Sequence, residues 1–322
     1  ERGATADVLN APTHEYTRRL VAAAPGLREG RLAPQVQDAV ESALFATFRD
    51  RVAAQGVANG AGARPDSILE VRGLGKSYGV RGGSFLAADD VSFAVPRGRT
   101  LSIVGESGSG KTTSARIAAR LVQPDAGTVL LDGEDITRAT GERLRQLRRR
   151  MQVVYQNPFG SLDPRMTVER IVAEPLRSFR VGDRASQRAL VRELLERVRL
   201  SADLADRRPG ELSGGQRQRV AIARALAIGP ELMILDEPVS ALDVSVQEQI
   251  LQLLVDLQAE FGLSYLFISH DLGVVRQISD RIVVMQKGRV VESGDAADVL
   301  GAPAHEYTRE LIAAIPGSSA VA

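Results

Sequence analysis

Short apolar runs alternate with helical patterns along most of this chain. The runs are SILEVRGL, VSFAV, TLSIVG, TVLLDG, MQVVYQ, ELMILDE, LSYLFIS, DRIVVMQ and RVVESG, and all of them lie between residues 67 and 294. This alternation predicts an α/β domain with a largely parallel central sheet. TLSIV and LMILD are continuously apolar, as expected of strands that are covered on both faces. Ligands of such sheets bind at the carboxyl ends of the strands.

The alternation is interrupted between residues 164 and 205. There the stretch RASQRALVRELLERVRL has apolar positions at spacings of three and four, which predicts helix. We therefore expect an inserted helical subdomain at about residues 157–228. The arginine-rich run ERLRQLRRRM, at 142–151, has no interleaved aromatic side chains, so we interpret it as a solvated helix face and expect no nucleic-acid partner.

The two ends of the chain repeat one another. Residues 1–26 align without a gap to residues 292–317, and 18 of the 26 positions are identical. The offset of 291 residues is the size of a whole domain, whereas solenoid repeats recur at roughly 20 to 50 residues. The alternative is a helical terminal segment that recurs by itself. We favour tandem fusion, in which 1–26 is the tail of a preceding domain.

Residues 27–67 between the copies are rich in alanine, glycine and glutamine, and their pattern predicts an amphipathic helix near 33–51. We interpret 27–67 as a linker, with packing on the preceding domain as the alternative. The main domain is then expected at 68–294, followed by a tail at 295–322.

Bulk composition narrows the range of functions. The chain has 41 basic and 40 acidic side chains, so no global field draws it to nucleic acid or anionic lipid. Cysteine is absent, which excludes disulfides, thiolate metal sites and cysteine nucleophiles. No apolar stretch approaches the roughly 20 residues that span a bilayer. The chain begins with Glu1 and lacks a signal-peptide pattern there, so we take it as a fragment.

The strand TLSIV continues into GESGSGKT at residues 105–112, which matches the phosphate-loop pattern in its required setting of strand, loop and helix. Glycines allow the backbone amides to surround a phosphate, and the helix that follows adds its positive N-terminal end. Lys111 is expected to reach the β- and γ-phosphates, and the Thr112 hydroxyl is placed to bind Mg²⁺. The predicted nucleotide-binding positions here are Gly105, Ser107, Gly108, Ser109, Gly110, Lys111, Thr112 and Thr113.

A second motif, ELMILDEP, ends a buried strand with two adjacent acids. Asp236 at the strand tip is predicted to hold Mg²⁺ through water. Glu237 is predicted to polarise the attacking water. Together the two motifs indicate a phosphate-loop NTPase that uses ATP and Mg²⁺, although they leave its branch open.

The segment between these motifs selects the branch. LSGGQ, at 212–216, opens a helical pattern whose N-terminus presents Ser213 with the amides of Gly214 and Gly215, followed by Gln216. An isolated SGG at a helix start is usually only a cap. In this position the segment resembles the signature of ATP-binding cassette (ABC) proteins, and the motif order is similar to that family throughout. The resemblance implies a cassette with a mostly parallel core sheet, an antiparallel β subdomain and an inserted helical subdomain.

The same resemblance implies roles for four other residues. Tyr78 in GKSYG resembles the aromatic residue that stacks on adenine, and Gln156 in VVYQNP resembles the glutamine that contacts Mg²⁺ and senses the γ-phosphate. Asp243 in SALD resembles the aspartate that couples two ATP sites. His270 in FISHD resembles the histidine that holds the γ-phosphate, so that Glu237, His270 and Gln156 form the expected catalytic set. His305 is expected to be structural.

Two further stretches, YQNPFGSLDPRMTVERIVAEPL and APAHEYTRELIAAIPG, resemble the oligopeptide and dipeptide importer branch of the family. The resemblance implies a peripheral subunit on the cytoplasmic face of the membrane. Its expected partners are the preceding cassette of the same polypeptide in a head-to-tail dimer, two transmembrane permease subunits and an extracellular solute-binding protein. Importers of nickel, glutathione or another small solute are alternatives. A soluble cassette ATPase and a regulatory module without turnover are less favoured.

Overall fold

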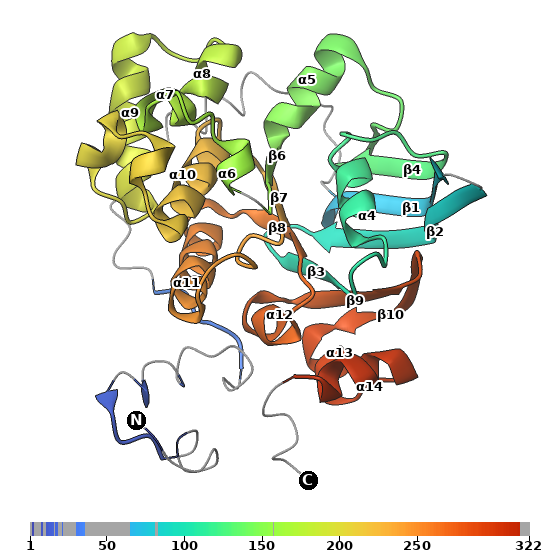
Figure 1. Ribbon diagram of the computed structural model, residues 1–322. Helices are drawn as coiled ribbons and strands as arrows, with labels where there is room; N and C mark the ends of the chain where they lie inside the picture. Colours follow the sequence, from blue (N-terminus) through green and yellow to red (C-terminus); the bar gives the residue numbers. More distant parts are fainter. Residues whose placement is uncertain are drawn as a thin grey trace.

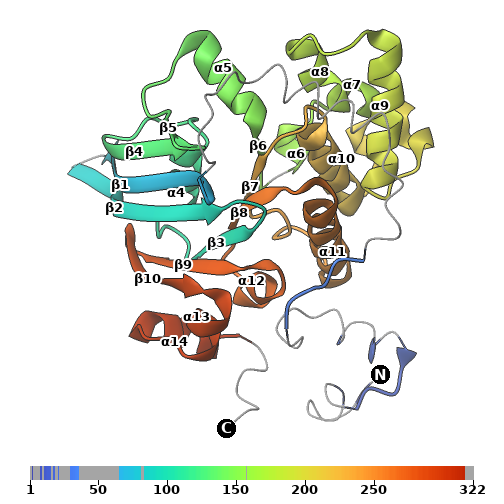
Figure 2. The same cartoon turned by 180° about the vertical axis from the view of Figure 1, so that it is seen from behind.

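A computed structural model describes residues 2, 8, 11–15, 17–18, 21, 30–35, 65–80, 83–156 and 158–315 of the chain, with the side chains of 80, 158 and 159 left out (Figure 1). Two sheets and a group of helices make up the part described. In both views the small sheet lies on one side of the central strands and the helical lobe on the other (Figures 1 and 2).

The larger sheet has six strands in the order β10-β9-β3-β8-β7-β6. Neighbours among β3, β6, β7, β8 and β9 pair in parallel, and β10 pairs antiparallel to β9. Every residue of β3, β7 and β8 is buried, which confirms the expectation of strands covered on both faces. The bounds are β3 Thr100–Val104, β6 Met151–Val154, β7 Leu232–Asp236, β8 Ser264–Ile268, β9 Arg281–Gln286 and β10 Arg289–Asp295.

The smaller sheet is antiparallel, with the order β2-β1-β4-β5. It confirms the antiparallel β subdomain. Its strands are β1 Ser67–Val80, β2 Gly83–Pro96, β4 Ala126–Leu131 and β5 Glu134–Asp135. β1 and β2 extend well beyond the apolar runs that predicted them, because their outer halves pair with each other as a two-stranded ribbon, as Tyr78 does with Phe85.

Helices cover the larger sheet and form a separate lobe beside it. The inserted segment forms α6 to α10, with two short 3₁₀ turns, and its apolar residues share one cluster with α11 and β7. The helices are α4 Lys111–Ala118, α5 Gly141–Arg150, α6 Pro158–Ser161, α7 Val168–Val172, α8 Glu174–Ser178, α9 Arg184–Arg197, α10 Gly214–Leu226, α11 Val244–Phe261, α12 Leu272–Ile278, α13 Ala296–Gly301 and α14 Glu306–Ala313. None of the helices in the described ranges is long and apolar enough to cross a membrane.

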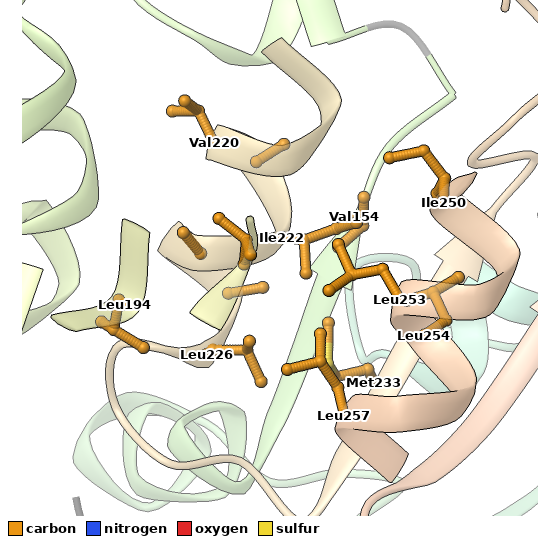
Figure 3. Packing of buried hydrophobic residues seen from close by; sticks show 14 of the residues in the cluster. Val154, Leu194, Val220, Ile222, Leu226, Met233, Ile250, Leu253, Leu254 and Leu257 are labelled. Carbon is orange, nitrogen blue, oxygen red and sulfur yellow. The ribbon is translucent and has the colours of Figure 1, made fainter. Parts of the chain in front are cut away.

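The core joins the helical lobe to the sheet. In Figure 3, Leu226 of α10, Met233 of β7 and Leu257 of α11 point toward one another, and all three are at most 1% exposed. Truncating one such side chain to alanine typically costs about 2–5 kcal/mol. This packing fixes the position of α10, and therefore of the signature motif at its start, relative to the central strands.

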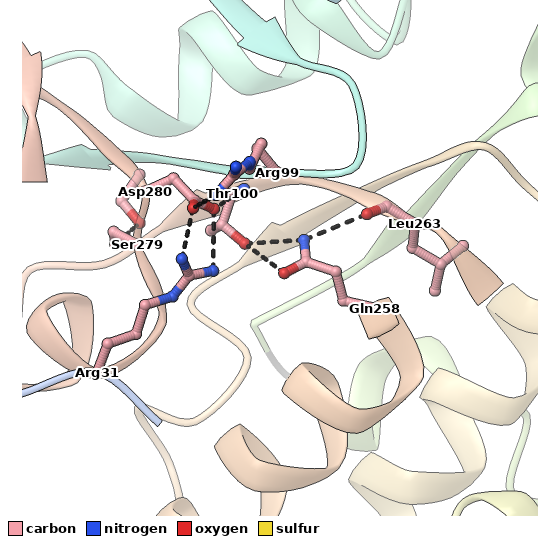
Figure 4. Close-up of polar contacts among 8 residues, drawn as sticks. Arg31, Arg99, Thr100, Gln258, Leu263, Ser279 and Asp280 are labelled. Carbon is pink, nitrogen blue, oxygen red and sulfur yellow. Dashed lines mark hydrogen bonds and ion pairs between the residues drawn. The ribbon is translucent and has the colours of Figure 1, made fainter. Parts of the chain in front are cut away.

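Residues 30–35 contact α11 and α12 of the main domain. Arg31 forms a two-pronged ion pair with Asp280, which also accepts a hydrogen bond from the Thr100 amide at the start of β3 (Figure 4). The Leu32 amide donates to the carbonyl of Gln277 at 2.8 Å, and its side chain is only 4% exposed. This short part of the predicted linker therefore packs on α11 and α12.

The predicted helix at 33–51 is wrong at its start, because residues 33–35 have no helical structure. Pro34 lacks a backbone donor, and the Gln35 amide bonds to the Asp256 carboxylate of α11 at 2.7 Å instead of to a helical carbonyl. Residues 36–51 lie outside the described residues.

The arginine-rich run forms α5, but only part of it is solvated. Arg150, whose side chain is 12% exposed, forms ion pairs with Asp132 and Glu231 at 2.8 and 2.7 Å. Arg149 stacks with its guanidinium 5.7 Å from the centre of the Phe179 ring. The interpretation as a solvated face therefore fails for the last turn, where the arginines tie α5 to β7 and to the helical lobe.

Candidate functional site

The phosphate loop connects β3 to α4 and lies against the backbone of two other strands. A Cβ atom added to Gly105 would be 2.1 Å from the Met285 carbonyl oxygen, and one added to Gly110 would be 2.2 Å from the Ala87 carbonyl oxygen. Gly110 also has φ 100°, a conformation that other residues rarely adopt. The loop can follow this path only with glycine at both positions.

The other predicted positions of the loop differ in exposure. Ser107 and Gly108 are exposed at its tip, Ser109 is 4% exposed, and Thr113 is half-buried on α4. The Ser109 hydroxyl is buried and has no hydrogen-bond partner among the described residues. The Ser109 amide bonds back to the Glu106 carbonyl at 3.2 Å, which closes the loop on itself.

Lys111 folds over the loop from the first turn of α4. Its Nζ donates to the carbonyl oxygens of Gly105 at 2.6 Å and Glu106 at 2.7 Å, and the residue is 5% exposed. Burial lowers the pKa of Lys111, while the carboxylates of Glu237 and Asp236 oppose that shift. The lysine is therefore held at the loop and beside two acids, as a phosphate-binding cation should be.

Thr112 and Asp236 bring two oxygens together where α4 meets the end of β7. The Thr112 hydroxyl donates to the Asp236 carboxylate at 3.2 Å. Asp236 is 5% exposed, and burial raises its pKa, against the opposing effect of the Thr112 hydrogen bond. A hydroxyl and a carboxylate beside the phosphate loop are hard oxygen donors of the kind that Mg²⁺ prefers, so these residues fit that ion.

Three predicted catalytic residues meet at the ends of neighbouring parallel strands. Glu237 follows β7, and its carboxylate accepts a hydrogen bond from Gln156 Nε2 at 2.7 Å and lies 3.2 Å from His270 Nδ1. Gln156 follows β6 and His270 follows β8, the two strands beside β7. Glu237 has φ 48°, a left-handed conformation that is uncommon outside glycine and is often found at functional sites.

The signature residues cap α10. The Ser213 hydroxyl accepts from the Gln216 amide at 3.2 Å, and the Gln216 side chain accepts from the Ser213 amide at 2.9 Å, which forms a capping box. Gly214 and Gly215 follow as the first helical residues, and a Cβ on Gly215 would be 2.5 Å from Val246 at the start of α11. The Ser213 side chain and amide therefore form hydrogen bonds only with the first turn of α10 and not with the group around Glu237.

Asp243 caps α11 in a similar way. Its carboxylate accepts from the Ser245 hydroxyl at 2.8 Å and from the Val246 amide at 3.0 Å, and these hydrogen bonds lower its pKa. Asp243 thus lies near the signature residues and is not part of the group formed by Lys111, Asp236 and Glu237.

Tyr78 lies on β1 and is 37% exposed. Lys76 Nζ is 5.6 Å from its ring centre, and the same ammonium is paired with Asp125 at 2.6 Å. Phe85, its cross-strand neighbour, is 48% exposed. The tyrosine therefore presents an open aromatic face on the small sheet, with no contact that fixes its ring to the phosphate loop.

A cavity of about 730 Å³ lies away from this site, at the amino ends of the parallel strands. Its lining includes Arg31, Arg99, Arg281 and Asp280. Arg31 and Arg99 are paired with Asp280, and Arg281 is paired with a carboxylate as well. Its lining has four arginines against two aspartates, so it is basic, but no residue of the phosphate loop lines it, and it therefore lacks the amide cradle of a nucleotide site.

One contact of the phosphate loop is not predicted by any local sequence pattern. The hydroxyl of Tyr307, in the C-terminal tail, accepts a hydrogen bond from the Glu106 amide at 2.9 Å. The resemblance of the tail to the importer branch does not predict a contact with the loop. The available signal was the repeat, since the sequence HEYTR occurs at residues 14–18 and again at 305–309.

Comparisons with known proteins show which families this chain resembles. Residues 88–240 match the family described as ABC transporter, and residues 1–49 and 291–320 match the oligopeptide/dipeptide transporter C-terminal region. A glutathione import ATP-binding protein of Salmonella typhimurium is 44% identical over 325 residues, which cover 98% of this chain and 51% of that protein. A putative peptide import ATP-binding protein of Brucella abortus is 48% identical over 249 residues, covering 77% of this chain and 78% of that protein.

Among solved structures, the ATP-binding cassette MJ0796 in a dimeric post-hydrolysis state bound to ADP and Pi has a TM-score of 0.65 and 32% identity. The match covers 71% of this chain and 98% of that chain. The chain spans about half the length of the glutathione import proteins that it matches.

Proposed function

Because the chain belongs to the family of ABC transporter ATP-binding proteins of the oligopeptide, dipeptide and glutathione import type, we propose that it binds and hydrolyses ATP to drive peptide import through a membrane transporter. The observation that carries the proposal is the meeting of Lys111, Asp236 and Glu237 at the carboxyl ends of the parallel strands β3 and β7. The residues proposed to bind phosphate (Lys111), metal (Asp236) and the attacking water (Glu237) therefore lie together.

The loop binds the triphosphate with its amides, and Lys111 exchanges its bonds to the Gly105 and Glu106 carbonyls in part for the β- and γ-phosphate oxygens. The α4 N-terminus adds a favourable dipole. The exposed Tyr78 ring stacks on adenine. Ser107, Gly108, Ser109, Gly110 and Thr113 complete the phosphate cradle.

Thr112 would hold the metal directly and Asp236 would hold it through water, with Gln156 as a further oxygen donor. When bound there, Mg²⁺ neutralises charge on the phosphates. The hydrogen bond from Thr112 to Asp236 keeps the two oxygens side by side. Burial of Asp236 makes its charge costly without a cation, which favours metal binding together with nucleotide.

Hydrolysis uses the group around Glu237. Its carboxylate accepts a proton from a water whose oxygen forms a bond to the γ-phosphorus, and the bond from that phosphorus to the β–γ bridging oxygen breaks to leave ADP and phosphate. Gln156 and His270 orient the carboxylate from either side. His270 then contacts the γ-phosphate. A positioned base of this kind contributes about 10²- to 10⁴-fold in rate.

The signature residues Ser213, Gly214, Gly215 and Gln216 serve a second nucleotide. Their local capping bonds leave the α10 N-terminus as an anion-binding end. In a head-to-tail dimer this end closes on the ATP held by the other cassette, and Asp243 couples the two sites. The dimeric state of the MJ0796 structure supports such pairing.

The other cassette precedes this one in the same polypeptide, so that residues 1–26 are its tail. The repeat of 1–26 at 292–317, the two matches to the transporter C-terminal region and the half-length match to the glutathione import proteins support the fusion. The local structure also repeats, since the Arg18 amide bonds to the His14 carbonyl as the Arg309 amide bonds to that of His305. A tether of this kind raises the effective concentration of the partner cassette to about the millimolar range.

The transmembrane partners dock in a groove between the sheet and the helical lobe. This groove of about 170 Å³ is lined by residues of α5, β6 and α10, and it exposes two apolar side chains, Leu121 at 40% and Tyr155 at 39%. Tyr155 directly precedes Gln156, the proposed γ-phosphate sensor. A permease segment bound in this groove would therefore contact the residue next to the sensor. We place the protein peripherally at the membrane on this basis, with an extracellular binding protein that delivers the solute.

The test is ATP turnover in the transporter assembled from the protein, its permease subunits and its binding protein. Turnover should rise when a peptide is supplied, and glutathione is the first individual solute to try because one relative is named for it. Lys111→Ala should abolish both basal and stimulated turnover. Turnover that proceeds without Lys111, or ATP binding without any coupling to permeases, would contradict the proposal.

A further inference from the structure

Tyr307 is buried in the tail at α14 and reaches the phosphate loop across 201 residues of sequence. The residue is 4% exposed, and its hydroxyl accepts the Glu106 amide hydrogen bond at 2.9 Å. Its ring belongs to the apolar cluster that includes Val104, the last residue of β3, and Leu272 of α12. Tyr307 therefore contacts the loop through the hydroxyl and supports the strand that carries the loop through the ring.

The tail holds this tyrosine in one place. The Glu292 carboxylate of β10 accepts from the amides of Ala304 at 2.7 Å and His305 at 3.1 Å. His305 Nδ1 in turn accepts from the Tyr307 amide at 3.1 Å, which caps α14 and confirms the structural role predicted for this histidine. Burial alone would raise the pKa of Glu292, but the Thr308 hydroxyl, followed by the Ala304 and His305 amides, outweighs it and lowers the pKa.

Glu106 links the tail to the lysine. Its amide donates to Tyr307, while its carbonyl accepts from Lys111 Nζ at 2.7 Å and from the Ser109 amide at 3.2 Å. The peptide groups on both sides of Glu106 are thus fixed, one by the tail and one by the lysine. The Glu106 amide shares its peptide group with the Gly105 carbonyl, so a rotation of that peptide would move the other carbonyl oxygen to which Lys111 Nζ donates, at 2.6 Å.

We infer that the C-terminal tail positions the phosphate loop for nucleotide, with the Tyr307 hydroxyl holding Glu106 and, through it, Lys111. Tyr307 is a positioning residue, because it acts through Glu106 and not on the phosphates. The inference rests on the proposed function of this site. The repeat extends it to the preceding cassette, whose tail carries the matching Tyr16.

The experiment compares Tyr307→Phe with Tyr265→Phe in the 322-residue chain. Both changes remove one hydroxyl from a buried tyrosine that has one hydrogen bond to the backbone, and the Tyr265 bond, to Leu254 O at 2.9 Å, lies away from the loop. Binding of fluorescent ADP with Mg²⁺ should be roughly two- to tenfold weaker in Tyr307→Phe, the range expected for one lost hydrogen bond, and unchanged in Tyr265→Phe.

Hydrogen exchange and steady-state kinetics distinguish a positioning role from a general loss of stability, because the expected effects are confined to the loop and to KM. In Tyr307→Phe the Glu106 amide should exchange faster while the helix amides keep their rates. In the assembled transporter, KM for ATP should rise by the same factor as the dissociation constant, and kcat should stay within about twofold.

The outcomes separate the inference from the proposed function. Wild-type chain that fails to bind nucleotide would contradict the proposed function. Wild-type binding with equal affinities for the two phenylalanine variants, or an unchanged exchange rate at Glu106, would overturn the inference alone.

Discussion

Gly110→Ala offers a sharp test of how tightly the phosphate loop is packed. The added Cβ would lie 2.2 Å from the Ala87 carbonyl oxygen, and contacts of real Cβ atoms are essentially never below 3.0 Å, so the loop and β2 must separate by at least 0.8 Å. The obstacle is backbone, which cannot rotate away as a side chain would. Residue 110 also has φ 100°, which alanine adopts only with strain.

Two costs combine in this variant. The backbone strain is about 1–2 kcal/mol and the overpacking about 1–3 kcal/mol, so unfolding should become easier by about 2–5 kcal/mol. A displacement of nearly 1 Å at the loop should also weaken nucleotide binding by about 10- to 100-fold. A chain of this size loses about 2–4 °C in Tm for each kcal/mol.

The matched control is Gly98→Ala. Gly98 has φ 67°, but a Cβ there would meet nothing within 4 Å. This variant should show only the backbone strain of about 1–2 kcal/mol and should bind nucleotide as the wild type does. Thermal unfolding with and without Mg²⁺ and ADP, together with fluorescent ADP titration, measures both effects. Nucleotide affinity equal to wild type in Gly110→Ala would refute the packing argument.

Three further predictions address the base, the N-terminal segment and the membrane partner. Glu237→Gln should retain ATP binding in a titration while phosphate release falls by about 10²- to 10⁴-fold, and unchanged turnover would show that the base lies elsewhere. Arg31→Ala removes the ion pair that anchors residues 30–35, so the Leu32 amide should exchange with solvent faster while nucleotide affinity is unchanged; equal exchange would mean that the segment is held without it. Leu121→Glu together with Tyr155→Glu puts charges in the groove beside α10, so co-purification with the permeases should fail although ADP binding persists; normal co-purification would place docking elsewhere.

The parts of the fold that were predictable depend on local patterns. The continuous apolar runs at β3 and β7 could only be strands covered on both faces, and glycine spacing with Lys111 marked the loop between β3 and α4. The role of Glu237 was predicted from its motif and that of His270 from the family resemblance, whereas their meeting depends on β7 and β8 being neighbours in the sheet, which the structure shows.

Other features depend on partners that are distant in sequence, which local patterns do not reveal. Arg150 looks like one more solvated arginine until Asp132 and Glu231 are placed beside it. The segment at Leu32 resembles a linker because its apolar content is low, and only its contacts with α11 and α12 reveal that it docks.

Tyr307 is a similar case, since a hydroxyl that bonds to a loop 201 residues earlier leaves no periodic trace. The outer ribbon of β1 and β2 was missed for a different reason. Its residues are mostly exposed and include glycine, so it lacks the apolar alternation that predicts a strand.

The most direct test of the account is a structure of the chain bound to Mg²⁺ and a non-hydrolysable ATP analogue. We predict that Lys111 Nζ binds the β- and γ-phosphate oxygens, that Thr112 Oγ1 binds the metal, and that the Glu237 carboxylate faces the γ-phosphorus across one water. A nucleotide seated elsewhere, such as in the arginine-lined cavity beside Asp280, would contradict the central claim.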